Sequence, residues 1–199
     1  MARLTPVIGS DANQRVVFCG PLGVGKTTAV RSISDVEVAN TDVVRAAARH
    51  GAPTPGAKTT TTVGIDYGEW RRADGSTVAV YGTPGQVRFD AVRKSAIGSR
   101  LTLVLWLFGQ NEYALDEADE WLTYLAGVDP TVLDLLTVAI TRLDASGPHP
   151  GLRDFRELLD TRSSSIPLTV ADPRNRGDVE HVVLTALDHR RSVRQGVAP

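Results

Sequence analysis

Residues 20–28 read GPLGVGKTT and match every fixed position of the pattern G-x-x-x-x-G-K-[ST]. The apolar run RVVFC before them is typical of a short buried strand, and residues 27–32 are typical of the first turns of a helix. Glycines allow the backbone N–H groups of such a loop to turn inward, and the N-terminus of the helix adds partial positive charge. We therefore expect this segment to bind the phosphates of a nucleoside triphosphate, the alternative being a chance glycine-rich turn.

The phosphate-binding pattern assigns a role to each of its side chains. Lys26 is expected to pair with the outer phosphates, and the Thr27 hydroxyl is expected to ligate Mg²⁺. The remaining candidates for contacts with the nucleotide are Gly20, Leu22, Gly23, Val24, Gly25 and Thr28. The chain has only three lysines, and its other basic residues are arginines. A lysine at position 26 therefore supports the phosphate-binding role, which needs a compact ammonium group on a flexible side chain.

Composition restricts the remaining possibilities. A chain of 199 residues is long enough for one nucleotide-binding domain with a full core, and too short for two. A formal net charge of −1 gives no electrostatic footprint for nucleic acid or for an anionic membrane. Cys19 is the one cysteine, and the N-terminus leads into no long apolar run, so we expect a cytoplasmic protein without direct membrane insertion.

The hydrophobic pattern predicts a single α/β domain. Strands are expected at 15–19, 65–67, 77–81, 101–107, 135–140 and 166–170, and helices at 42–49, 89–96, 111–126, 152–159 and 179–187. The pair Asp74-Gly75 predicts a two-residue hairpin turn. The acidic residues at 116–120 are expected to be the solvated face of their helix. This order predicts a three-layer domain over 15–191 with a mostly parallel sheet and one antiparallel hairpin strand, between a loose lead-in (1–14) and a flexible tail (192–199).

Two further segments resemble the Ras-like small GTPases, and the likeness implies a Ras-like G domain. Residues 58–68 read KTTTTVGIDYG and are similar to the first switch of that family, in which Thr62 ligates Mg²⁺ and senses the γ-phosphate. Thr61 is the alternative in register, and the alternative for the whole segment is a run of threonines that merely begins a strand. Residues 82–86 read GTPGQ, where the resemblance implies that Gly85 contacts the γ-phosphate and Gln86 orients the attacking water; a plain turn is the alternative.

The glycine at position 82 departs from the wider small-GTPase pattern, which has an aspartate there. The form with T-P-G-Q after it resembles the bacterial MglA-like and conservon GTPases, which work with Roadblock/LC7-domain partners. Because the absent carboxylate normally supports the Mg²⁺ shell, we expect the diphosphate state to hold the metal weakly. Chelation of Mg²⁺ is then expected to accelerate GDP release only modestly.

Two segments resemble the base-binding motifs of the same family. Residues 141–144 read TRLD where the family has N-K-x-D, which implies that Thr141, Arg142 and Asp144 face the base and that Asp144 accepts hydrogen bonds from guanine. Residues 171–176 read ADPRNR and are similar to the D-A-R-x-R stretch of conservon GTPases, which places backbone amides near Ala171 and Asp172 at the guanine oxygen. Turn or helix capping is the alternative for Asp144 and for Asp172.

Together these features predict a switch that binds GTP and GDP with Mg²⁺ and hydrolyses GTP slowly, with Roadblock-type stimulation implied by the resemblance. A regulatory module that binds nucleotide without hydrolysing it stays open, because Gly82 weakens the predicted metal site. A small-metabolite kinase with Arg174 and Arg176 as its lid also stays open. The oligomeric state and the source of any catalytic arginine, Arg49 and Arg88 included, do not follow from the sequence.

Overall fold

A seven-stranded sheet forms the centre of the molecule, with the strand order β2-β3-β4-β1-β5-β6-β7. The computed structural model describes residue 12 and residues 14–43, 63–83, 101–143 and 149–196. The strands are β1 (Gln14–Cys19), β2 (Ala39–Val43), β3 (Val63–Arg71), β4 (Thr77–Gly82), β5 (Leu101–Phe108), β6 (Leu136–Thr141) and β7 (Leu168–Val170). Strand β3 runs antiparallel to β2 and β4, and the pairs from β4 through β1, β5 and β6 to β7 are parallel. The predicted mostly parallel sheet with one antiparallel hairpin strand is confirmed.

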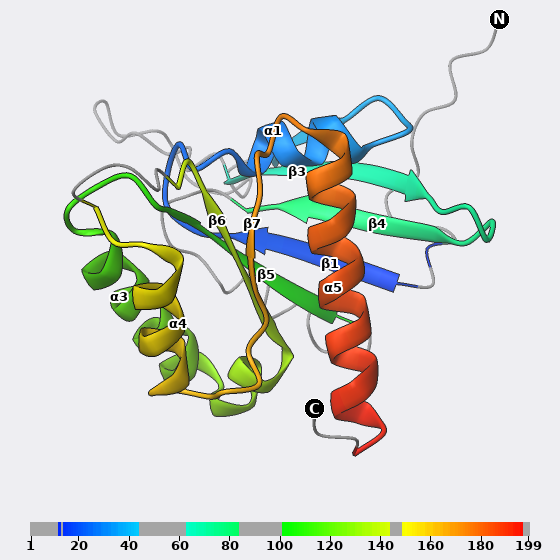
Figure 1. Cartoon of the computed structure of the whole chain (residues 1–199). Helices are drawn as coiled ribbons and strands as arrows, with labels where there is room; N and C mark the ends of the chain where they lie inside the picture. The colour runs from blue at the N-terminus through cyan, green and yellow to red at the C-terminus, as the bar shows by residue number, and fades with distance from the viewer. Residues whose placement is uncertain (1–11, 13, 44–62, 84–100, 144–148, 197–199) are drawn as a thin grey trace, which may run out of the picture.

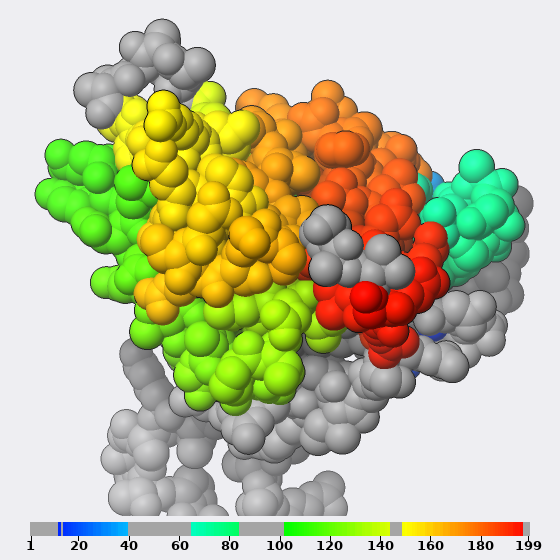
Figure 2. All heavy atoms as spheres, turned by 60° about the horizontal axis from the view of Figure 1, so that its bottom comes forward, coloured from blue at the N-terminus to red at the C-terminus, as the bar shows by residue number. Residues whose placement is uncertain are grey.

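Helices cover both faces of this sheet and give the predicted three layers (Figure 1). Helices α1 (Lys26–Ile33) and α5 (Arg176–Arg194) pack on one face, and α3 (Ala114–Val128) and α4 (Leu152–Asp160) pack on the other. A 3₁₀ helix, η1 (Pro130–Leu135), leads from α3 into β6 and lies beside α5 (Figure 2). None of the helices in the described part of the chain is long and apolar enough to cross a membrane.

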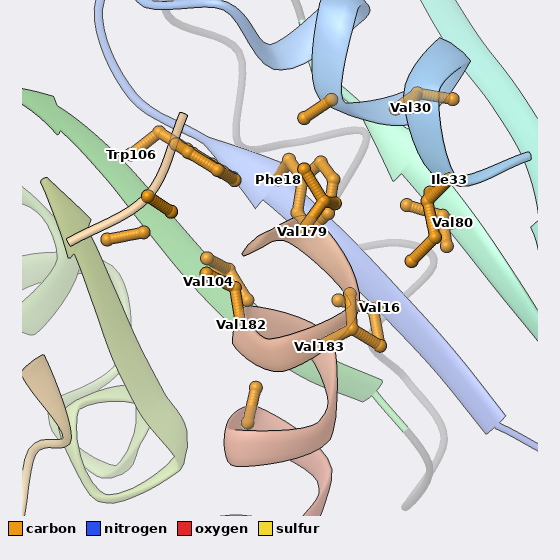
Figure 3. Packing of buried hydrophobic residues seen from close by; sticks show 14 of the residues in the cluster. Val16, Phe18, Val30, Ile33, Val80, Val104, Trp106, Val179, Val182 and Val183 are labelled. Carbon is orange, nitrogen blue, oxygen red and sulfur yellow. The ribbon is translucent and has the colours of Figure 1, made fainter. Parts of the chain in front are cut away.

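Alternation along the buried strands divides the core into two clusters. On β1, Val16 and Phe18 face α1 and α5, whereas Val17 and Cys19 face α3 and α4. Strand β5 is buried on both faces in the same way, which explains its continuous apolar sequence. Figure 3 shows the first cluster, where the rings of Phe18 and Trp106 meet edge to face with centroids 5.7 Å apart. This packing fixes β1 and β5 under the loop that follows β1.

The hairpin between β3 and β4 turns through three residues, so the predicted two-residue turn is wrong. The Arg72 N–H donates to the Ser76 carbonyl oxygen at 2.9 Å, which leaves residues 73–75 as the loop. Gly75 lies at φ 81°, the left-handed conformation that ends a three-residue hairpin loop. The register that results places Asp66 opposite Gly82.

Residues 39–43 form the edge strand β2, so the helix predicted to begin at residue 42 is wrong over its first two residues. Ala39 pairs with Tyr67 and Val43 with Val63 in the antiparallel ladder with β3. Local capping signals are outweighed here by pairing with a strand that lies far away in the sequence. The rest of that predicted helix and the helix predicted at 89–96 lie outside the described residues. Helix α5 continues to Arg194, past the expected start of the tail.

Candidate functional site: a phosphate-binding loop with a carboxylate from the neighbouring strand

The loop between β1 and α1 has the backbone geometry that phosphate binding requires. Gly20, Gly23 and Gly25 have φ angles of 131°, 78° and 109°. A Cβ on Gly20 would lie 2.0 Å from the Trp106 carbonyl oxygen, and one on Gly25 would lie 2.6 Å from Pro173 Cγ. No side chain of the described residues caps the N-terminus of α1, which begins directly after Gly25. The amide groups of its first turn are therefore available to an anion.

The other predicted phosphate-loop residues divide between core and surface. Val24 is buried in the cluster with α1 and α5, whereas Leu22 is 72% exposed. Thr28 is exposed on the first turn of α1. The side chain of Val24 belongs to the core, and those of Leu22 and Thr28 face outward. We therefore expect these three residues to contact a nucleotide through their backbone at most.

The Lys26 side chain folds back over the loop between β1 and α1. Its ammonium group donates to the carbonyl oxygens of Gly20 at 2.8 Å and of Pro21 at 2.7 Å. Burial lowers the pKa of Lys26, and the nearby Asp66 carboxylate opposes this change. The loop therefore presents a positive charge with an uncapped helix N-terminus behind it.

Asp66 is a candidate site residue that the sequence analysis did not single out. It is buried on β3, and its Oδ2 atom accepts a hydrogen bond from the Thr27 hydroxyl on the first turn of α1. Asp66 pairs with Gly82 across the β3–β4 ladder. A Cβ placed on Gly82 would lie 3.3 Å from both Cβ and Oδ2 of Asp66. The carboxylate of Asp66 thus lies beside the space that a side chain at position 82 would enter.

The residues present suit a magnesium ion shared with a nucleotide. A hydroxyl oxygen and a carboxylate oxygen come together at Thr27 and Asp66, and Mg²⁺ prefers oxygen ligands while keeping several waters. Among the described residues no group of three or more His, Cys, Asp or Glu side chains could hold a metal by itself. The donor set therefore fits an ion held chiefly by phosphates and water.

The ends of β6 and β7 lie on the other side of the phosphate loop. Thr141 is buried at the end of β6, and its carbonyl oxygen accepts from the Gly109 N–H at 2.9 Å. Arg142 follows with φ 54°, and its guanidinium carbon lies 5.3 Å from the centroid of the Phe108 ring. An exposed cation is therefore held at this edge, where a planar ring can stack on it.

The segment after β7 is closed by its own hydrogen bonds. The Ala171 N–H donates to the Ile140 carbonyl oxygen at 3.0 Å, so it is engaged rather than free for a base. Asp172 forms an ion pair with Arg174 at 2.8 Å, and hydrogen bonds from the Arg174 side chain and backbone lower the pKa of Asp172 to about 2. Asn175, not Asp172, caps α5.

Several predicted site residues lie outside the described residues: Thr61, Thr62, Gly85, Gln86 and Asp144, together with the arginine candidates Arg49 and Arg88. The described structure brings together the phosphate loop, Asp66, Arg142 and the segment 171–175 at the carboxyl ends of the parallel strands. Ligands of open α/β sheets bind at this edge.

Comparison with known proteins identifies the fold. No protein-family model matches the chain, and no curated protein matches it significantly. Among solved structures it is similar to the cytosolic domain of the T. maritima FeoB iron transporter in its GMPPNP form, with a TM-score of 0.54 and 14% identity. The match covers 89% of this chain and 64% of that one, so this chain spans less than two thirds of its length.

The chain has a three-layer P-loop fold. The phosphate loop, the uncapped first turn of α1 and the strand order agree with this likeness.

Proposed function

We propose that this protein is a nucleotide-dependent switch that binds GTP and GDP with Mg²⁺ and hydrolyses GTP slowly. The observation that carries the proposal is the Asp66 carboxylate on the Thr27 hydroxyl beside an uncapped phosphate loop. Such an arrangement supplies anion donors and metal ligands together, which a bare glycine-rich turn does not. The similar FeoB domain is a GMPPNP form, and this guanine nucleotide analogue supports the choice of base.

In this proposal Thr27 ligates the metal, and Asp66 orients the Thr27 hydroxyl. Because the Thr27 hydroxyl donates a hydrogen bond to Asp66, a lone pair of Thr27 Oγ1 is directed away from Asp66 and is available to the ion. Bound Mg²⁺ would neutralise charge on the phosphate oxygens. We therefore replace the expectation of a weakly held metal, which rested on Gly82, with that of a metal site supported from β3.

Hydrolysis and partner binding are proposed from the sequence. Thr62 and Gly85 are the residues we propose to sense the γ-phosphate, and Gln86 the residue that orients water. The resemblance of GTPGQ to the MglA-like and conservon GTPases supports a Roadblock/LC7-domain protein as the partner that stimulates turnover. A cytoplasmic location follows from the same proposal.

The contacts of the described residues favour the switch over its two rivals in this proposal. The module without hydrolysis rested on a missing carboxylate, and Asp66 now stands beside that place. The kinase needed Arg174 and Arg176 as a lid, but Arg174 pairs with Asp172, and Arg176 pairs with Asp35 and Glu180. Neither rival has a described feature that the switch does not explain.

The proposal is tested by the release of fluorescent GDP from the wild-type protein, with Mg²⁺ and after chelation by EDTA at fixed ionic strength. We expect chelation to accelerate release by at least about tenfold, which corresponds to about 1.4 kcal/mol of metal-dependent retention. Fluorescent ADP serves as the matched control and is expected not to be retained. Acceleration below about threefold would contradict the proposed metal site, and retention of ADP equal to that of GDP would contradict the proposed switch.

A further inference from the structure

Gly25 connects the phosphate loop to α1, so its position sets where the first turn of the helix presents its N–H groups. Its φ angle is 109°, and its carbonyl oxygen accepts from the Ala29 N–H at 2.8 Å. No described side chain caps this end of α1. Because glycine has more backbone freedom than any other residue, a contact from elsewhere is needed to hold this conformation before a phosphate binds.

The ring of Pro173 supplies such a contact. Pro173 lies between β7 and α5 and is buried. A Cβ on Gly25 would lie 2.6 Å from Cγ and 3.0 Å from Cβ of Pro173, so the ring packs directly on the glycine. Proline makes this a rigid surface, because its ring fixes its own φ angle.

The segment that carries Pro173 is itself anchored on α1 and on α5. The Ser32 hydroxyl on α1 lies 2.9 Å from the Pro173 carbonyl oxygen and 3.0 Å from the Ala29 carbonyl oxygen, and it can donate to both. On the other side, the Asp172 N–H donates to Asp178 Oδ2 on α5 at 2.9 Å. The ring is therefore held in place from two helices.

These contacts run without a break from α5 through Pro173 to the phosphate loop. We propose that Pro173 is a positioning residue for phosphate binding: its ring, anchored through Ser32, holds Gly25 and the first turn of α1 in the conformation that receives an anion. The ring acts through Gly25 and not through a hydrogen bond of its own, since proline has no N–H to donate. This inference rests on phosphate binding, which is one part of the proposed function, and does not depend on the choice of base.

The test is an NMR titration of the nucleotide-free full chain, labelled with ¹⁵N-glycine, with inorganic pyrophosphate in Mg²⁺ buffer. Changes in the amide signals of Gly23 and Gly25 give the dissociation constant, and the signal of Gly75 in the β3–β4 hairpin is the internal reference. We expect Pro173→Ala to bind pyrophosphate at least about fivefold more weakly than the wild type, because binding must then also order the loop. Pro167→Ala, which removes a proline ring before β7, is the matched control and should leave the dissociation constant unchanged.

Ser32 offers a second pair of variants, which decides the matter if Pro173→Ala does not fold. Ser32→Ala removes the hydroxyl that holds the Pro173 carbonyl group and should weaken pyrophosphate binding by at least about threefold, as for one neutral hydrogen bond. Ser32→Thr keeps a hydroxyl and should restore the wild-type affinity. In free Pro173→Ala the Gly25 signal should shift or broaden while the Gly75 signal stays in place, which a uniform loss of stability does not produce.

Equal pyrophosphate affinity of Pro173→Ala and the wild type overturns the inference alone, and so does a Ser32→Thr protein that binds as weakly as Ser32→Ala. Wild-type glycine signals that do not move with pyrophosphate overturn phosphate binding at this loop, and the inference with it. Equal binding of GDP and ADP overturns the guanine-specific switch but leaves the positioning role standing, because pyrophosphate carries no base.

Discussion

Moving the carboxylate from β3 to β4 tests whether a side chain at position 82 can support the same Mg²⁺ site as Asp66. Asp66→Ala removes the acceptor of the Thr27 hydroxyl, and Gly82→Asp restores a carboxylate on the residue paired with it. The double variant Asp66→Ala/Gly82→Asp therefore carries the same charge on the neighbouring strand β4. Thr27 is unchanged in the three variants.

The magnitudes follow from the contacts. Asp66 is 8% exposed and accepts a hydrogen bond from the Thr27 hydroxyl, and a hydrogen bond to a carboxylate contributes about 1.5–3 kcal/mol. Loss of such an outer-shell partner lowers metal affinity by about 10- to 100-fold. Gly82→Asp alone puts its Cβ 3.3 Å from Asp66 Oδ2 and 3.3 Å from Val30 Cγ2, so crowding and like charge should destabilise the fold by about 1–3 kcal/mol. The double variant removes the contact with Oδ2 and the like charge, whereas the contacts with Val30 Cγ2 and with the Cβ of residue 66 remain.

The assay is the rate of fluorescent-GDP release as a function of Mg²⁺ concentration. We expect Asp66→Ala to raise the Mg²⁺ concentration at the midpoint of this curve by about 10- to 100-fold. The double variant is expected to return that concentration to within about threefold of wild type. Urea unfolding of all four proteins separates stability from metal affinity. An unchanged midpoint in a folded Asp66→Ala protein would refute the role of Asp66.

Three other variants test the remaining parts of the account. Lys26→Ala removes the ammonium group that Gly20 and Pro21 hold over the loop, and we expect fluorescent-GDP affinity to fall at least tenfold; unchanged affinity would contradict its role. Gln86→Leu should leave affinity nearly intact and lower single-turnover GTP hydrolysis with a Roadblock-type partner, and equal rates would show that another group orients the water. Leu122→Ala empties a fully buried position on α3, and we expect a loss of about 2–5 kcal/mol in the free energy of unfolding by urea; a loss below about 1 kcal/mol would mean that this face is loosely packed.

The parallel part of the sheet was predictable because its signals are local. Strands β1, β5 and β6 are mostly apolar, and the motif after β1 prescribes a strand, a loop and a helix in order. The stripe of α3 follows from its 3.6-residue period, as the burial of Ala118, Leu122 and Leu125 confirms. The short 3₁₀ helix η1 gave no periodic signal of its own.

The Asp66 site was not predictable from the residues alone, because it depends on strand register. A two-residue turn at Asp74-Gly75 would place Asp66 opposite Thr83, and a slip of one residue directs a side chain to the other face of the sheet. The three-residue loop that forms instead places Asp66 opposite Gly82 and within reach of Thr27. The signal in the sequence was an aspartate within the strand expected at 65–67, one strand before Gly82. Strand β2 escaped prediction for a similar reason, since its partner β3 lies about 25 residues further along the chain.

The central claim is that the site beside the phosphate loop selects guanine nucleotides with Mg²⁺. Its most direct test is the pair of dissociation constants of GDP and ADP for the wild-type protein in Mg²⁺ buffer, measured by displacement of fluorescent GDP. The account predicts that GDP binds at least 100-fold more tightly, because a site built to pair the N1 and N2 edge of guanine rejects a base that lacks those donors. Dissociation constants for GDP and ADP within threefold of each other would contradict it.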